Sequence, residues 1–248
     1  MANEDIQYRC NGMNIIDKIK RKITKLRFQP IRVFVFHQVS DSFDKSTMWE
    51  CDWTQAEAFK RMIVDYMNEY TFISLEDAHM HLINDHIRTK KYAVLTCDDG
   101  WASIQSIIPW LTAQNIPVTL FLNPAYLLKE EVRERGMDKL INEEELIAML
   151  KIGEQSITIG SHGWNHGLCA DQSYSLFKEN VCNSITFLKK YDEFVPYFAY
   201  PCGKHKVGQD EYLFSQKITP VYCDGAKNYN NNRVIHRECI DKGYNGVC

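Results

Sequence analysis

The sequence lacks several features that would assign a chain to a common class at once. Its 248 residues contain no long apolar run, and a membrane-spanning helix needs about 18 or more such residues. The first ten residues, MANEDIQYRC, lack the apolar stretch of a secretory signal. The nine cysteines are scattered with no CxxC pair, which argues against a disulfide framework and a structural zinc knuckle. We therefore expect a cytoplasmic protein with reduced cysteines.

An excess of positive charge is also missing. The formal net charge is −3 at pH 7, whereas proteins that bind nucleic acid are usually basic. We expect no nucleic-acid partner. No GxGxxG follows a predicted strand, so a dinucleotide site is not expected either.

Segments with strand character alternate with segments with helical character. The predicted strands are 31–36, 92–97, 117–122, 156–160, 197–200, 218–223 and 233–239, and the predicted helices are 54–70, 74–86, 102–115, 142–151 and 173–191. Thr54 with Glu57, Ser74, and Asn142 with Glu145 are the expected N-terminal caps. Such alternation predicts a parallel sheet in one α/β domain, a barrel rather than an open sheet.

A basic segment precedes this domain. Residues 14–27 combine a stripe of isoleucines and Leu26 with six lysines and arginines. Two interpretations stay open: peripheral contact with the inner membrane surface, or a surface helix docked through its apolar stripe. We expect residues 1–30 to form this segment and residues 31–248 to form the catalytic domain.

Polar clusters follow three of the predicted strands, at the end where parallel α/β folds build their sites. Asp98 and Asp99 end the strand in VLTCDDGW, and His162 and His166 lie in SHGWNHG. A divalent cation would offset the repulsion of the paired carboxylates, and two histidines four apart on a helical turn can reach one ion. Taken singly, two adjacent aspartates commonly lie in a solvated turn, and two histidines four apart are commonly a surface pair. Their shared placement favours a centre for one divalent metal, Zn²⁺ or else Co²⁺, Ni²⁺ or Fe²⁺. One of the two aspartates would then be a metal ligand and the other a base.

In that order, LTCDDGW, SHGWNHG and FAYPCG resemble the motifs of the polysaccharide deacetylase family, carbohydrate esterase family four with the NodB-homology fold. The family's motifs are T-F-D-D-G, H-S/T-x-x-H and R-x-P-x-G. Cys97 stands in the place of the Phe, Gly163 in the place of the Ser or Thr, and Ala199 in the place of the Arg. The resemblance runs from about residue 31 to 237 and is greatest to members with an FAYP third motif.

The resemblance implies a distorted, incomplete (β/α) barrel and a role for each motif. Asp98 becomes the base, and Asp99, His162 and His166 become the metal ligands. The backbone N–H of Cys202 would bind the oxyanion. The residues expected to contact substrate are His37, Trp101, Trp164, Tyr200 and Pro201.

Two roles lack their usual residue. Because Ala199 replaces the arginine that orients the base, we expect Arg237 or Arg233 to take over. We assign the general acid to His236 in VIHREC, with His37 and His205 as rivals.

The sequence therefore predicts a metal-dependent hydrolase that removes an N-acetyl or N-formyl group from a sugar. A cytoplasmic location favours a nucleotide- or lipid-linked glycan precursor in envelope polysaccharide or lipopolysaccharide biosynthesis as the substrate. Two alternatives stay open: a catalytically silent carbohydrate-binding member, motivated by the missing arginine, and a hydrolase of a non-sugar C–N amide bond.

Overall fold

The large sheet of the protein is built from parallel strands only. The computed structural model describes residues 29–42, 52–84, 88, 90–129, 140–230 and 232–241. Within them, the large sheet has the order β1-β10-β9-β8-β7-β6-β5-β4. These strands are β1 (Arg32–Phe36), β4 (Thr71–Phe72), β5 (Tyr92–Asp98), β6 (Val118–Leu122), β7 (Ile157–Ser161), β8 (Phe194–Ala199), β9 (Thr219–Cys223) and β10 (Ile235–Cys239).

The sheet closes on itself because β1 pairs with β10 on one side and with β5 on the other. β4 pairs only with the first residues of β5 and stays outside the ring, so the ring has seven strands, the eight of the sheet minus β4. A complete (β/α) barrel has eight. The predicted distorted, incomplete barrel is therefore confirmed. Because all strands are parallel, their carboxyl ends lie at one rim.

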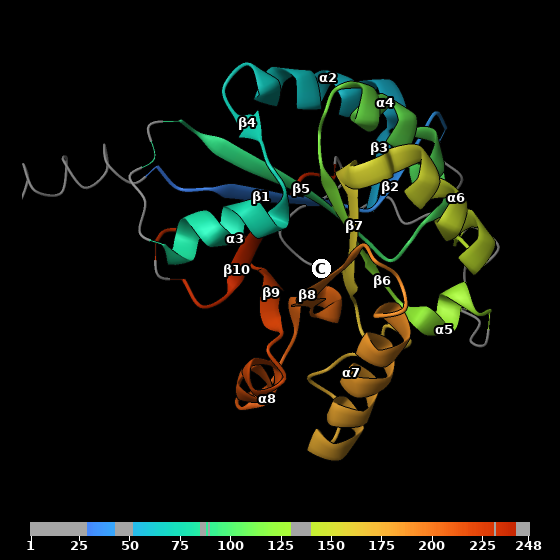
Figure 1. Ribbon diagram of the computed structural model, residues 1–248, viewed down its shortest axis with the longest axis vertical. Coiled ribbons are helices and arrows are strands. Elements are labelled where there is room, and N and C mark those ends of the chain that lie inside the picture. Colours follow the sequence, from blue (N-terminus) through green and yellow to red (C-terminus); the bar gives the residue numbers. More distant parts are fainter. Residues whose placement is uncertain are drawn as a thin grey trace, which may run out of the picture.

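Helices surround the ring (Figure 1). They are α2 (Ala56–Met67), α3 (Leu75–Ile83), α4 (Ile108–Ala113), α5 (Pro124–Leu127), α6 (Glu143–Gly153), α7 (Tyr174–Leu188) and α8 (Gln209–Ser215), with short 3₁₀ turns η2 (Ala102–Ser106), η4 (Glu154–Ser156) and η5 (Pro201–Gly203). No helix of the described ranges is both long and apolar enough to cross a bilayer. The predicted basic segment at 14–27 lies outside those ranges.

The cap predictions are confirmed at two helices and wrong at a third. Ser74 caps α3, and Asn142 forms a reciprocal capping box with Glu145 at α6. At α2 the cap is Gln55, whose side chain accepts the N–H of Ala58. The predicted cap, Thr54, instead lies in β3 (Trp53–Gln55), which pairs with β2 (Gln38–Ser40). β2 therefore lies in a segment, 38–40, that is not among the predicted strands.

Strand β5 illustrates how the barrel separates core from site. Leu95 and Cys97 point outward and pack in the cluster beneath α2, α4 and α6. Val94 belongs to the inner cluster, to which β1, β6, β8, β9, β10 and α3 also contribute. The alternation of strand side chains then directs Thr96 and Asp98 inward as well. The interior is thus apolar at the amino end and polar at the carboxyl rim.

Candidate active site

The predicted metal ligands converge at the carboxyl rim. Among the described residues, Asp99, His162 and His166 form one of two groups of side chains able to hold a metal ion. Oδ1 of Asp99 lies 3.5 Å from Nε2 of His162 and 3.2 Å from Nε2 of His166. Three residues from two distant loops therefore present their donor atoms to a common point.

The spacing of these donors fits a small divalent ion. Zinc bonds to nitrogen and oxygen of about 2.0–2.2 Å, at tetrahedral angles, separate neighbouring donors by about 3.3 Å. The separations of 3.2 and 3.5 Å are close to this value. Two imidazoles and one carboxylate suit Zn²⁺ and also Fe²⁺, Co²⁺ and Ni²⁺. Three protein ligands leave further positions for water and substrate, as in catalytic sites.

His162 is oriented and kept neutral for ligation. Its Nδ1 lies 2.8 Å from the carbonyl oxygen of Ala199, which fixes Nδ1 as the protonated nitrogen and leaves the Nε2 lone pair toward Asp99. Burial lowers the pKa of His162 to about 4, so its contacts with the aspartates are not ion pairs at neutral pH. Ala199 stands where the family usually has an arginine, and its backbone carbonyl orients His162, a predicted metal ligand.

Trp101 has a different place from the one predicted. We expected it to contact substrate, but its side chain is buried and its indole N–H donates to Oδ2 of Asp99 at 3.1 Å. This bond leaves Oδ1 of Asp99 facing the two histidines. Trp101 therefore positions the carboxylate of Asp99, a predicted metal ligand, and its buried side chain is not exposed for contact with a substrate.

The histidines lie on an irregular loop and not on the helical turn we expected. Gly163 has φ +78°, and a Cβ there would meet Oδ1 of Asn180 at 2.9 Å, so the Ser or Thr usual in the family's second motif would not fit. The same oxygen of Asn180 accepts the N–H of Trp164 at 2.8 Å. The amide of Asn123 donates to the carbonyl of His162. Neither asparagine was singled out from the sequence, because side-chain support of a loop from a distant element leaves no local pattern.

Asp98 is held by Arg237 through two parallel hydrogen bonds. The guanidinium nitrogens lie 2.6 Å from Oδ1 and 2.8 Å from Oδ2, and both side chains are at most 5% exposed. Burial alone would raise the pKa of Asp98, but the charge of Arg237 leaves it below its ordinary value. The carboxylate is therefore ionised and fixed in direction. Of the two arginines proposed from the sequence, Arg237 reaches Asp98, whereas the exposed Arg233 lies over the ring of Phe214.

The structure does not bring His236 to this site, which corrects our expectation for the general acid. His236 neighbours Arg237 on β10, and adjacent residues of a strand point to opposite faces. Its Nδ1 contacts Asp224 at 2.8 Å on the outer side. His205, one of its two rivals, is exposed and stacks on Tyr222, whose ring also packs edge-on against His236.

His37, the other rival, lies at the rim beside the aspartates. It directly follows β1, whose last residue pairs with Cys97. Its Nδ1 lies 2.7 Å from Oδ2 of Asp241, and its side chain is 13% exposed. Burial lowers the pKa of His37, but Asp241, with Asp99 and Asp98 adding smaller contributions, leaves it well above the ordinary value. Asp241 was missed by the sequence analysis because a single aspartate after a strand carries no pattern.

The third motif forms the turn after β8. Cys202 has φ +53°, a conformation that costs of order 1–3 kcal/mol for a non-glycine residue. Asp99 and His166 share this left-handed region, so backbone strain recurs at the site. The role of the Cys202 N–H stays a prediction.

The remaining substrate contacts predicted from the sequence divide into two groups. Tyr200 and Pro201 are buried, and the Tyr200 hydroxyl donates to Asp210, so neither side chain is exposed for contact with a substrate. Trp164 is partly exposed, and its ring packs edge-on against Phe187 of α7. Its contact with substrate stays a prediction.

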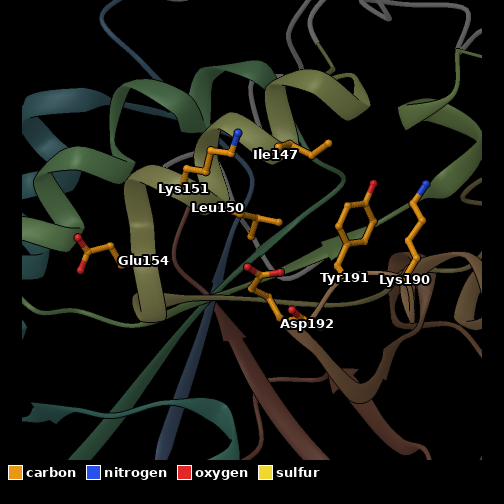
Figure 2. A pocket seen from close by; sticks show the side chains of 8 residues that line it. Ile147, Leu150, Lys151, Glu154, Lys190, Tyr191 and Asp192 are labelled. Carbon is orange, nitrogen blue, oxygen red and sulfur yellow. The ribbon is translucent and has the colours of Figure 1, made fainter.

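A separate pocket lies at the opposite end of the barrel. Figure 2 shows its lining, which includes Ile147 and Lys151 of α6 and Tyr191 after α7. Its volume is about 360 Å³. Because it is formed by residues that precede β7 and β8, it lies at the amino ends of these strands, where barrel folds place stability and not catalysis.

Fold and site together define a (β/α) barrel with a candidate metal centre and an oriented carboxylate at its carboxyl rim, the arrangement of a hydrolase. The sequence matches the family model of polysaccharide deacetylases over residues 85–217, more than half of the chain. The chain belongs to the polysaccharide deacetylase family, and this membership supports a carbohydrate de-N-acetylase. The matched segment contains both aspartates and both histidines of the candidate metal centre but neither His37 nor Arg237.

Solved structures share the fold. IcaB from Ammonifex degensii superposes with a TM-score of 0.69 at 20% identity, covering 86% of this chain and 92% of that one. The deacetylase PplD from Streptococcus pyogenes, in complex with acetate, gives 0.69 at 16% identity, with 85% and 92% covered. The BpsB deacetylase domain from Bordetella bronchiseptica gives 0.65 at 15% identity, with 85% and 96% covered. No curated protein sequence matches the chain.

Proposed function

We propose that the protein is a metal-dependent hydrolase that removes the N-acetyl group of a sugar. The observation that carries this proposal is the convergence of Asp99, His162 and His166 beside a carboxylate, Asp98, that is held on both oxygens by Arg237. The oriented base also removes the reason for considering a silent carbohydrate-binding member, which was the missing third-motif arginine. The complex of the structural neighbour PplD with acetate agrees with acetate as the product.

Each group has a defined task in amide hydrolysis. A divalent ion held by Asp99, His162 and His166 would supply Lewis-acid activation of water and of the amide carbonyl. Asp98 accepts the proton of the attacking water, and Arg237 keeps it ionised. The N–H of Cys202 donates to the oxygen that becomes negative in the transition state.

The protonation of the leaving amine falls to His37 in place of His236. A general acid must carry a proton at the working pH, and the contact with Asp241 keeps the imidazolium form of His37 favoured. His37 lies at the same rim as Asp98, while His236 lies on the other face of the sheet.

Two variants at the aspartates separate ligand from base. The assay combines metal analysis of the purified protein with acetate release from nucleotide-linked, lipid-linked and polymeric N-acetyl sugars. We expect Asp99→Ala to lose both metal and acetate release. Asp98→Asn should retain the metal and lose turnover by about 10²–10⁴-fold, the usual contribution of a general base. Asp224→Asn, which changes a carboxylate on the outer face, is the matched control and should stay within about twofold of the wild type.

Two results would contradict this assignment. An active Asp98→Asn protein would remove Asp98 from the role of base. A wild-type protein that holds no divalent ion and is not activated by zinc or cobalt would revive the silent alternative.

The substrate is proposed to be a lipid- or nucleotide-linked glycan precursor in envelope polysaccharide or lipopolysaccharide assembly, processed in the cytoplasm. The lipid-linked version rests on the basic residues 14–27, which would attract anionic headgroups. Deleting residues 1–27 should then reduce association with anionic vesicles, and unchanged association would leave the nucleotide-linked version.

A further inference from the structure

Beside the candidate metal centre lies a second group of metal-ligating side chains. His37, Cys239 and Asp241 each offer one ligand atom, and these atoms lie within 4.8 Å of one another. We propose that they form a second divalent-metal site, selective for ions that accept thiolate such as Zn²⁺, and that its occupation inhibits the enzyme by taking the acid His37. The inhibition rests on the proposed function, whereas the site itself does not.

The geometry needs little change to hold zinc. With a zinc–sulfur bond of about 2.3 Å and a zinc–oxygen bond of about 2.0 Å, sulfur and oxygen of a tetrahedral site lie about 3.5 Å apart. Sγ of Cys239 and Oδ2 of Asp241 are 3.4 Å apart. Nδ1 of His37 and Oδ2 of Asp241 are 2.7 Å apart, so they must separate by about 0.6 Å when an ion replaces the proton between them. The other oxygen of Asp241 accepts the backbone N–H of His37 at 3.3 Å, which keeps the carboxylate in place.

Charge balance favours a divalent ion at this site. A carboxylate and a thiolate together carry two negative charges, which balance the charge of Zn²⁺, and a neutral imidazole adds none. Because the side chain of Asp241 is fully buried, an occupied site with no net charge avoids a large desolvation cost.

The donor set distinguishes the two sites chemically. Asp99, His162 and His166 offer nitrogen and oxygen only, whereas the second site adds the sulfur of Cys239. Thiolate favours Zn²⁺ over Mg²⁺, Ca²⁺ or Mn²⁺. An ion on Nδ1 leaves His37 as a neutral ligated imidazole, which has no imidazolium proton to give to the leaving amine.

Cobalt titration tests the site without relying on activity. The full-length protein is stripped of metal, kept reduced with a phosphine, and titrated with Co²⁺. The wild type should bind two ions per chain and develop the near-ultraviolet charge-transfer band of a cobalt–thiolate bond. Asp99→Ala, which disables the first site, should keep this band. Cys239→Ser should lose it, and Cys182→Ser, which changes an exposed cysteine of α7, should keep it.

A zinc titration of acetate release tests the inhibition. In the wild type, acetate release at excess zinc should be at least about tenfold lower than at one equivalent of zinc. In Cys239→Ser, the two activities should be nearly equal. A wild-type protein without the thiolate band, or a Cys239→Ser protein that retains it, overturns the second site. A thiolate band in a protein that releases no acetate supports the second site and counts against the proposed function instead.

Discussion

Replacing Arg237 by methionine should cost both stability and turnover, because it removes the side chain that holds both oxygens of the buried Asp98 carboxylate. Asp98 is 3% exposed and Arg237 is 1% exposed, and the two bonds that join them are 2.6 and 2.8 Å long. Methionine has a similar length and fills the space, so the change acts mainly on charge. Removing one member of a buried pair typically costs about 3–5 kcal/mol, since it leaves the other charge uncompensated.

That loss is measurable by thermal unfolding. For a domain of this size, each kcal/mol lowers Tm by about 2–4 °C, so Arg237→Met should lower Tm by about 6–20 °C at neutral pH. The pKa of Asp98 is lowered in the folded protein, so the pair stabilises above the ordinary pKa of an aspartate, near 3.8. That contribution is lost as the pH falls through the lowered value. The difference between variant and wild type should therefore narrow on acidification below about pH 4.

Adding a second substitution, Asp98→Asn, tests whether the stranded carboxylate causes the loss of stability. Asp98→Asn combined with Arg237→Met removes the stranded charge and should recover part of the lost Tm, although it cannot restore turnover. Arg233→Met, at an exposed arginine, should change stability by about 0.5 kcal/mol at most. The ion-pair reasoning is refuted if Arg237→Met has the same Tm as the wild type, or if the double variant is no more stable than Arg237→Met.

The remaining predictions concern groups that support the site. Asp241→Asn should lower the pKa of His37, so the alkaline limb of kcat against pH, where His37 loses its proton, should move to lower pH; an unmoved limb would exclude His37 as the acid. Trp101→Phe keeps the packing but removes the indole N–H to Asp99, and should weaken zinc affinity about 10–100-fold in a competition assay with a chelator; unchanged affinity would show that this bond is dispensable. Gly163→Ser places a Cβ 2.9 Å from a side-chain oxygen at φ +78°, and should destabilise the protein by about 1–3 kcal/mol in denaturant unfolding.

The barrel and the convergence of Asp99, His162 and His166 could be predicted from the sequence because their signals are local. Each strand is a short apolar run, and Asp99, His162 and His166 follow such runs in recognisable motifs. The short strands β2, β3 and β4 carry too few residues for a pattern, and they were missed. Asn180, Asn123 and Asp241 were also missed, because each acts on a segment far along the chain.

The assignment of His236 could have been avoided from the sequence alone. It neighbours Arg237 on a predicted strand, and strand side chains alternate between two faces. Both residues therefore could not face one site, and choosing Arg237 as the partner of Asp98 should have excluded His236. The choice between Arg237 and Arg233, by contrast, required the register of β10 against β9 and β1.

The closure of the barrel between β1 and β10 has a consequence for the order in which the protein is made. β10 is the last strand of the described chain, yet it carries Arg237 and leads to Asp241, while the candidate metal ligands follow β5 and β7, which are synthesised earlier. A nascent chain that has released only residues up to β8 already contains Asp99, His162 and His166, but it has neither the partner of Asp98 nor that of His37. The candidate metal site can therefore be complete during synthesis before Asp98 and His37 have their partners, which arrive only when β10 closes the sheet.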